Sequence, residues 1–304
     1  MTPERSRSWG AVASLLAASI IWGFTFVAQR SAMEHVSPFS FNGVRFLLGS
    51  LSLVPAWIFV RRRERRKSIT KSRSNRSTWL LAGAIGLSLF AGATLQQVGL
   101  VYTTAGKAGF ITGLYVILVP VIGLFLGQRV RWTVWTGATI ALGGLYLLTG
   151  FDSGGLSLGD GLVLASAFAW AAHVQLVGVV VHRMHPVRIA LVQTAICGTL
   201  SLVVGLLAEP GGLAGLDGAI PALLFAGVAS VGIAYSLQIA GQRGVAPARA
   251  GIIVSLEAVF AVLGGWLLLG EQVSGILLAG CALILAGTVL SQLGRRSRLE
   301  GWAG

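Results

Sequence analysis

Ten long apolar runs divide this chain and constrain its fold more than any other feature. Each is close to the roughly 20 residues that a helix needs to cross the roughly 30 Å hydrocarbon layer of a bilayer. The runs are continuous, whereas membrane barrel strands alternate apolar and polar residues in segments of about ten. The sequence therefore predicts an all-α integral membrane protein with ten transmembrane helices. The expected spans are 10–30, 38–60, 78–100, 106–127, 131–150, 159–181, 187–208, 218–240, 248–269 and 273–293.

The composition excludes an ordinary soluble domain. Hydrophobic residues make up 55% of the chain, charged residues only 11%, and the mean hydropathy is +0.80. Soluble globular proteins carry about 25% charged residues. The first span follows Arg5 and Arg7, as the core of a signal peptide follows its basic residues. It is longer than the roughly 7 to 15 residues of such a core, so we expect an uncleaved first span.

Basic residues gather between the apolar runs and give a formal net charge of +13. The segment 61–76, RRRERRKSITKSRSNR, holds nine Lys and Arg residues against one Glu. Because cytoplasmic connections carry such an excess, we expect this segment, both termini and the basic C-terminal tail in the cytoplasm, with the protein in the cell membrane (the inner membrane of a Gram-negative bacterium). The segment should attract anionic membrane lipids. Nucleic acid is not an expected partner.

The two halves of the chain are related. Corresponding positions recur at offsets of 142 or 148 residues: Gln96 and Gln238, Tyr115 and Glu257, Trp22 and Trp170. Each half contains five spans, an odd number, so the second half must enter the membrane in the opposite orientation. The sequence predicts two inverted five-helix repeats, 1–150 and 151–304. Such repeats in secondary transporters enclose a substrate site near the bilayer midplane and alternate its access.

Spans five and ten carry small residues at helical spacing. Gly137 and Gly144 share one face of span five, and Gly280 and Gly287 share one face of span ten. Small faces let helices approach closely in lipid. We assign both spans to the scaffold or to packing in a homodimer, and not to the substrate path.

The two copies resemble the EamA-type transporters of the drug/metabolite transporter superfamily. The resemblance is carried by GKAGFITGLYVILVPVIGLFLGQRV in the first half and SLEAVFAVLGGWLLLGEQVSGILLAGCALILAG in the second, with Ile21-Trp22-Gly23 and Arg45-Phe46 near the start. It implies ten helices in two inverted repeats and movement of small organic solutes, often export of amino acids or related metabolites. Aromatic or neutral amino acids are the branch we expect, with drugs, nucleosides or other metabolites as the alternative.

Glu257 is the acid in the middle of the ninth span, and Tyr115 occupies the corresponding position of the fourth. An acid at this depth is costly and usually faces a polar cavity or partner. Glu257 could exchange a proton with substrate, attract an ammonium group, or remain protonated and hold two helices together. We expect it and Tyr115 on opposite walls of a central cavity.

Aromatic side chains indicate what such a cavity could bind. Trp170 and His173 share a face of span six with Ser166, and Trp22 lies at the matching position of span one. Two tryptophans offer apolar planes with one hydrogen-bonding edge each, which suits an aromatic or aliphatic solute. The alternatives are packing or lipid-facing tryptophans and a histidine that only bonds between helices.

Polar side chains of spans three and eight are the remaining candidates: Gln96, Gln97, Tyr235 and Gln238. Amides and a phenol can satisfy the ammonium and carboxylate of a solute, although they could equally hydrogen-bond helix to helix. For Arg45 in span two, we favour a side chain that snorkels to the outer surface or pairs with Glu34 over one that lines the outer vestibule and meets a carboxylate.

Two further classes of function compete with transport. A membrane enzyme would need a cluster such as paired carboxylates or a Ser/His pair at matched depth, and the acids other than Glu257 lie in connections or tails. We therefore expect no enzyme, cofactor or metal. A channel or an accessory subunit without transport activity is the third alternative.

Overall fold

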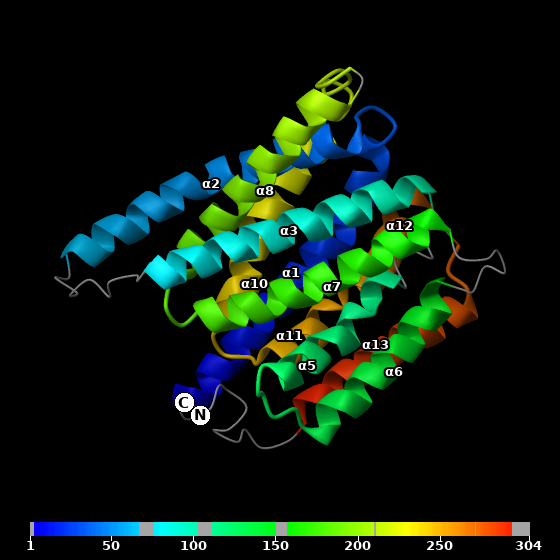
Figure 1. The fold of residues 1–304 in the computed structure, drawn as a ribbon. Helices are drawn as coiled ribbons and strands as arrows, with labels where there is room; N and C mark the ends of the chain where they lie inside the picture. Colours follow the sequence, from blue (N-terminus) through cyan, green and yellow to red (C-terminus); the bar gives the residue numbers. More distant parts are fainter. Residues whose placement is uncertain are drawn as a thin grey trace.

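The computed structural model describes residues 3–66, 76–102, 111–149, 157–209, 211–270 and 272–293. Within these ranges all regular elements are helical (Figure 1). In chain order they are α1 (Pro3–Ala32), α2 (Pro38–Arg66), α3 (Arg76–Tyr102), α5 (Tyr115–Phe125), α6 (Trp132–Thr149), α7 (Leu158–Val180), α8 (Pro186–Ala208), α9 (Ile220–Leu224), the π-helix η1 (Phe225–Ala234), α10 (Tyr235–Gly241), α11 (Pro247–Val254), α12 (Glu257–Leu269) and α13 (Gly275–Gln292).

The predicted fold class is confirmed. Eight segments are long and apolar enough to cross a membrane, and two shorter apolar helices, Ile111–Phe125 and Trp132–Leu148, occupy the predicted fourth and fifth spans. The described part of the chain thus contains ten membrane segments in two sets of five. The second helix is longer than the expected span 38–60, because α2 continues into the basic segment as far as Arg66. Arginine and glutamate are good helix formers, and residues 67–75 lie outside the described ranges.

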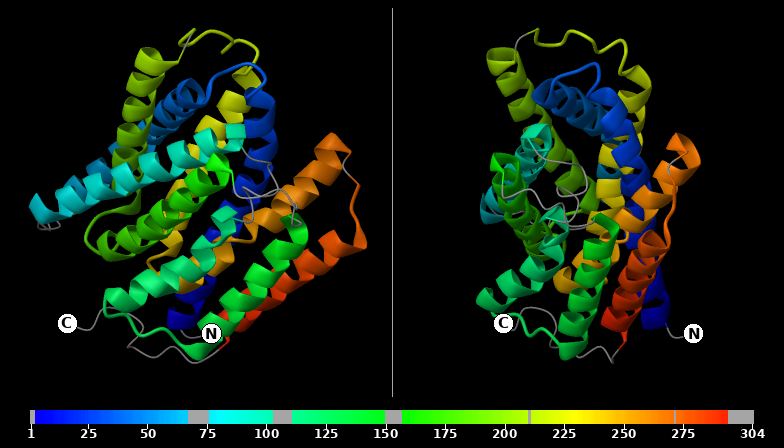
Figure 2. Two further views of the ribbon diagram at one scale, coloured as in Figure 1. Left: turned by 45° about the vertical axis from the view of Figure 1, so that its right-hand side comes forward. Right: turned by 90° about the vertical axis from the view of Figure 1, so that its right-hand side faces the viewer.

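Helices of the two repeats alternate through the molecule. The most closely packed helix pairs, α2 with α8, α3 with α7 and α6 with α13, each join one helix from each repeat (Figures 1 and 2). Helix α1 runs against η1, α10, α11 and α12 of the second repeat. The boundary between the repeats therefore passes through the middle of the protein, where a shared cavity can form.

Glycine explains the closest of these pairings. A Cβ at Gly137 would lie 2.5 Å from the carbonyl oxygen of Gly287, and one at Gly287 would lie 2.4 Å from that of Gly137. Gly144 and Gly280 repeat the arrangement one or two turns away, at 2.6 and 2.8 Å. Only residues without a Cβ allow backbones to approach this closely. The small faces of α6 and α13 thus pack on each other within one chain.

Local sequence sets the helix ends. Ser157 and Asp160 form a capping box at the start of α7, with the Asp160 amide donating to the Ser157 hydroxyl at 3.1 Å. The Glu209 carboxylate accepts the amides of Phe39 and Ser40 at 2.7 and 2.9 Å. These amides belong to the first turn of α2, whose N–H groups have no partner inside the helix. Glu209 thereby ties the end of α8 to the start of α2.

Three spans are interrupted, which the apolar pattern did not predict. Span nine breaks at Ser255 and Leu256, between α11 and α12, and span four breaks at Leu114, before α5. Span eight contains the π-helix η1. Broken helices in membranes occur where the backbone is buried in protein or lines a cavity, and π-helical turns are frequent at functional sites. All three interruptions lie close to the cavity described next.

Candidate substrate cavity

A cavity of about 700 Å³, counting its open mouth, lies between the two repeats. Clefts between packed helices are where small organic ligands usually bind, so this cavity is the candidate site. The N-terminal repeat contributes Trp22, Thr25, Gln29, Arg45, Phe46, Gln96, Thr112 and Tyr115, and the C-terminal repeat contributes Trp170, His173, Val174, Ser230, Val231, Tyr235, Gln238, Val254 and Glu257. Its wall is therefore divided almost evenly between the repeats.

The structure brings eight of the nine predicted site residues to this cavity: Trp22, Gln96, Tyr115, Trp170, His173, Tyr235, Gln238 and Glu257. Gln97 is the exception, because its amide donates to the Met33 sulfur at 3.1 Å, away from the cavity lining. Successive residues of a helix point about 100° apart, and Gln97 turns toward Met33 whereas Gln96 faces the cavity. Binding of substrate by these residues stays a prediction.

Ten lining residues form five pairs related by the internal repeat. At an offset of 148 these are Trp22 with Trp170 and Thr25 with His173; at an offset of 142 they are Gln96 with Gln238, Thr112 with Val254 and Tyr115 with Glu257. The starts of α2 and α8, Pro38 and Pro186, follow the first offset. The cavity therefore lies on the pseudo-twofold axis that relates the repeats.

Tyr115 and Glu257 are the first residues of α5 and α12, directly after the breaks in spans four and nine. The expectation that they stand on opposite walls is wrong, because their side chains interact with each other. Residues related by a twofold axis meet when both lie close to it. The Tyr115 hydroxyl interacts with the Glu257 carboxyl, although not in full hydrogen-bond geometry.

Tyr235 is the centre of an aromatic cluster. Its ring lies 4.9 Å from that of Trp22, 6.0 Å from that of His173 and 6.1 Å from that of Phe46, measured between centroids. The His173 ring lies 6.1 Å from that of Trp170 at an interplanar angle of 83°. Edge-to-face contacts of this kind stabilise aromatic pairs. They hold a rigid apolar surface against which a side chain of a solute can pack.

Arg45 departs most from its predicted role. Only 6% of the residue is exposed, and its guanidinium donates to the Gln29 amide oxygen at 2.7 Å. The side chain lies 5.0 Å from the ring centroids of Phe41 and Phe46 and lines the cavity. The favoured interpretation, a snorkelling side chain or a pair with Glu34, is therefore wrong. The sequence did contain a signal for its partner, since Gln29 follows Trp22 and Thr25 on one face of α1.

Several cavity residues already have hydrogen-bond partners. The imidazole Nε2 of His173 lies 2.9 Å from the Gln193 amide oxygen, and Gln96 donates to the Thr112 hydroxyl at 3.0 Å. Gln238 donates to Gln242 at 3.2 Å. Beside these, four buried lining atoms find no partner among the described residues: Arg45 Nε, the Tyr115 hydroxyl, Trp170 Nε1 and Gln238 Oε1. They offer a solute both donors and an acceptor.

Two residues that the sequence did not single out, Ser230 and Val231, also line the cavity, and both belong to the π-helix η1. The predicted site residue Tyr235 follows this π-helix as the first residue of α10. The wider turn of a π-helix changes which side chains share a face. The 3.6-residue period that we used to compare helix faces therefore does not apply along this segment.

Inverted five-helix repeats around a central cavity define a membrane transporter. The chain belongs to the EamA-like transporter family, whose model matches residues 9–150 and again residues 157–293. This confirms the resemblance drawn from the two sequence copies.

Individual relatives agree with this class. An uncharacterized transporter of Archaeoglobus fulgidus is 31% identical over 90% of this chain and 83% of its own length. A probable amino-acid metabolite efflux pump of Salmonella typhimurium is 26% identical over 96% of this chain and 97% of its own length. A crystal structure with a TM-score of 0.77 covers 93% of this chain and 97% of its own at 21% identity, which shows the shared fold.

Proposed function

We propose that this transporter is a secondary exporter of small organic solutes, with aromatic or neutral amino acids and related metabolites as its substrates. The observation that carries the proposal is the cavity with five symmetry-related residue pairs at the junction of the repeats. Transporters built from inverted repeats bind substrate at such a junction and expose it to each side in turn. The efflux pump of Salmonella typhimurium, named for amino-acid metabolites, supports the choice of substrates.

Hydrogen bonds between the repeats lie toward one end of the spans, and we propose that they close the cavity on that side. The Gln175 amide donates to the Val119 carbonyl at 2.7 Å, and Gln128 donates to Gln175 at 2.8 Å. The Ser19 hydroxyl donates to the Ile253 carbonyl at 3.1 Å. Each bond joins one repeat to the other on the side that the positive-inside rule predicts to be cytoplasmic. In the proposed cycle these bonds break when the cavity opens to that side.

Glu257 is the proposed coupling residue. It is the ionisable acid of the lining and begins α12 at the break in span nine. A carboxyl group there can bind either a proton or the ammonium of an amino acid, and the two then compete for one site. Such competition is the simplest way in which outward movement of solute can be exchanged for inward movement of protons. The Tyr115 hydroxyl beside it can hydrogen-bond whichever form is present.

The test is transport by the purified full-length protein in liposomes. We expect saturable uptake of an aromatic amino acid such as phenylalanine, with competition by unlabelled phenylalanine. Trp170→Ala removes a cavity wall and should lower uptake at least about tenfold, in line with the ~1.4 kcal/mol that a tenfold loss represents. Phe168→Ala is the matched control, because Phe168 lies on the same helix, is 52% exposed and does not line the cavity. Flux without saturation would instead identify a channel.

We also propose cytoplasmic termini, with segment 61–76 against anionic lipid on that side. Nine basic residues in this segment support the orientation. In a background without Cys197 and Cys281, single cysteines at Thr70 and Gly155 should react from opposite sides of the membrane. Labelling of both from one side would refute the inverted arrangement. Whether two chains associate is a separate question, and a dimer would need a surface other than the α6–α13 contact already formed within one chain.

A further inference from the structure

We propose that Arg45 binds the carboxylate of the transported solute and makes the cavity selective for acids and zwitterions over esters, amides and amines. The inference rests on the proposal that this cavity is the substrate site. Arg45 belongs to the first repeat, and the residue at the corresponding position of the second repeat does not share this binding role.

The position of Arg45 leaves donors for a ligand. The residue is buried and lines the cavity, yet its described hydrogen bond uses one guanidinium nitrogen, which donates to Gln29. Its Nε atom has no partner among the described residues. A guanidinium has five N–H donors in a planar fork that matches the two oxygens of a carboxylate. The guanidinium carbon lies over the rings of Phe41 and Phe46, 5.0 Å from each ring centroid.

The charge of Arg45 also lacks a described counter-ion. Among the described residues no carboxylate forms an ion pair with its guanidinium, and Tyr235 and Cys197, which interact with it electrostatically, are not carboxylates. The acid of the same cavity, Glu257, interacts with Tyr115 instead. A buried charge without a partner is costly in a membrane protein. A solute carboxylate would remove that cost on binding, and an uncharged ester or amide would not.

Pseudo-symmetry gives an internal reference for this role. At the offset of 148, Arg45 corresponds to Gln193, a neutral residue whose amide is bonded to His173. The second repeat therefore has an amide–imidazole pair where the first has a guanidinium bonded to an amide. Two carboxylate sites would let a solute bind in either direction about the twofold axis, whereas a single one fixes its orientation.

The acid completes a dipolar site. Tyr235 lies within electrostatic range of both Arg45 and Glu257, whereas the two charged residues form no described ion pair with each other. An amino acid can place its carboxylate at Arg45, direct its ammonium group toward Glu257 and pack its side chain on the aromatic cluster around Tyr235. This arrangement favours net-neutral zwitterions over cations.

The experiment compares binding of phenylalanine, phenylalanine amide, 3-phenylpropionate and phenethylamine to the detergent-purified protein, read from tryptophan fluorescence and thermal stabilisation. Wild type should prefer each acid over the analogue that lacks the carboxylate by at least about tenfold, as expected for charge-assisted hydrogen bonds. Arg45→Gln, which installs the residue of the second repeat, should abolish the preference. Arg45→Lys should keep a weaker preference, because it retains the charge without the fork.

Controls separate this inference from a folding defect and from the transport proposal. Arg188→Gln removes a cation that pairs with Glu64 outside the cavity and should leave the preference intact. A wild-type protein without acid preference, or an Arg45→Gln protein that retains it, would overturn the role of Arg45. Acid-selective binding without flux would refute transport and leave Arg45 as a carboxylate site. Saturable flux that does not depend on the carboxylate of the solute would support transport and refute the role of Arg45.

Discussion

The two repeats place corresponding side chains around one cavity but give them different chemistry. Trp22 and Trp170 are the same residue at the same pseudo-symmetric position, as are Gln96 and Gln238. Closer to the axis the corresponding residues differ, because the first repeat has Tyr115 where the second has Glu257. The shared positions build a cavity that two inverted halves can open in turn, and the differing ones give it polarity.

The third helix of each repeat shows the same contrast in the backbone. Helix α3 is α-helical from Arg76 to Tyr102, whereas its counterpart passes through the π-helix η1 before Tyr235. At the offset of 142, the position of Tyr235 is Ala93 in the first repeat. The second repeat therefore supplies the central ring of the aromatic cluster as well as the acid. The first supplies the cation, so a solute meets two chemically distinct walls.

The largest effect should come from the residues at which the repeats differ on the axis. Glu257→Gln removes the ionisable group and keeps its size, so we expect proton-coupled uptake of phenylalanine to fall at least about a hundredfold, or ~2.7 kcal/mol. Tyr115→Phe removes only the hydroxyl that interacts with Glu257 and should cost about tenfold at most. The measurement is uptake into proteoliposomes with and without a pH gradient.

The ratio of the uptake lost in the two variants tests whether the two repeats differ in function. Equal losses for Glu257→Gln and Tyr115→Phe would mean that the two repeats contribute alike and that the acid has no special role. Wild-type uptake by Glu257→Gln at every pH would remove the coupling role altogether. Both purified variants should elute from a size-exclusion column as the wild-type protein does, because each substitution nearly keeps the volume of the side chain.

Much of the scaffold could be predicted from the sequence because lipid imposes it. Ten apolar runs, their charged connections and two offsets were enough to predict the ten helices and to bring Trp22, Trp170 and Glu257 to one cavity. These predictions depend on the length of a span and on repetition, both of which the sequence shows directly. The small faces of spans five and ten are equally visible in the sequence, but the contact of Gly144 with Gly280 within one chain is seen only in the structure.

The remaining features depend on where helices are broken and which face turns inward. The sequence places Arg45 near the outer end of span two and does not show that Gln29 and two phenylalanine rings surround it. Gln97 was placed with Gln96 although adjacent residues diverge on a helix. Tyr115 and Glu257 were set apart because hydropathy does not reveal that both follow a break near the axis.

Where the repeats agree, symmetric substitutions should have equal effects. Gly144→Leu and Gly280→Leu each insert a side chain against a carbonyl oxygen of the opposite helix, less than 3 Å from the new Cβ. Overpacking of this kind costs about 1–3 kcal/mol, so the midpoint of thermal unfolding should fall by a similar amount in both. Gly143→Leu, at a position with nothing within 4 Å of the built Cβ, should be neutral. A marked inequality between Gly144→Leu and Gly280→Leu would show that α6 and α13 are not equivalent.

A smaller effect should distinguish the two helix contacts that flank the cavity. Gln175 bridges α7 to α5, whereas its counterpart at the offset of 148 is Val27, which packs near Gly264 of α12. Gln175→Val therefore gives the first contact the chemistry of the second. Loss of two membrane hydrogen bonds at about 0.6 kcal/mol each should speed amide hydrogen exchange in α5 several-fold.

Exchange in α12 serves as the internal reference for this variant. It should not change, because Val27 and Gly264 are untouched. Leu164→Val, an exposed position of α7, should leave both helices as in wild type. Unchanged exchange in α5 would mean that the Gln128–Gln175 contact does not hold the closed side of the cavity.

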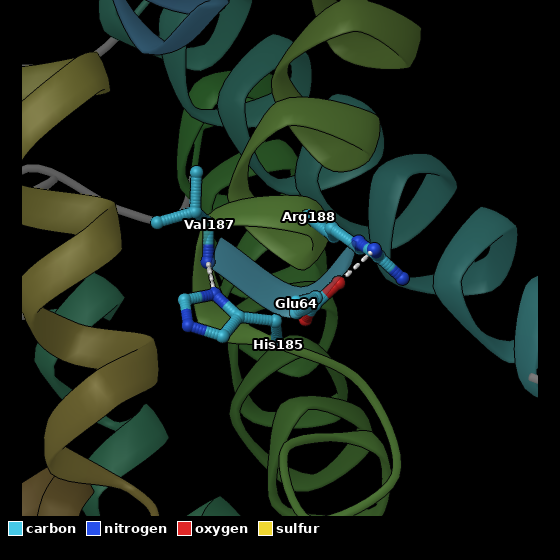
Figure 3. Close-up of polar contacts among 4 residues, drawn as sticks. All are labelled: Glu64, His185, Val187 and Arg188. Atoms are coloured by element: carbon cyan, nitrogen blue, oxygen red, sulfur yellow. Dashed lines mark hydrogen bonds and ion pairs between the residues drawn. The ribbon is translucent and has the colours of Figure 1, made fainter. Parts of the chain in front are cut away.

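The smallest predicted effect concerns the helix starts at Ser37 and His185, which correspond at the offset of 148. His185 Nδ1 accepts the Val187 amide at 3.3 Å and caps α8, beside the ion pair between Arg188 and Glu64 (Figure 3). Burial, and then the charge of Arg243, lower the pKa of His185 below its ordinary value; Glu64 opposes this and Arg188 adds to it. A protonated Nδ1 could not accept the amide, so the cap requires the neutral ring.

This pKa difference makes stability depend on pH. Because the unfolded chain protonates His185 at a higher pH than the folded protein does, stability is full above the ordinary histidine pKa of about 6.5 and falls as the pH decreases through it. His185→Ser installs the residue that the first repeat has at this position and supplies a capping oxygen without a titrating group. It should flatten the loss of stability between about pH 7.5 and about pH 5.5 by less than ~1 kcal/mol, because the site is partly exposed. His182, whose pKa is also lowered, would retain its own share of the slope. If thermal unfolding of the variant kept the full pH dependence of wild type, the two helix starts would be equivalent in spite of their different caps.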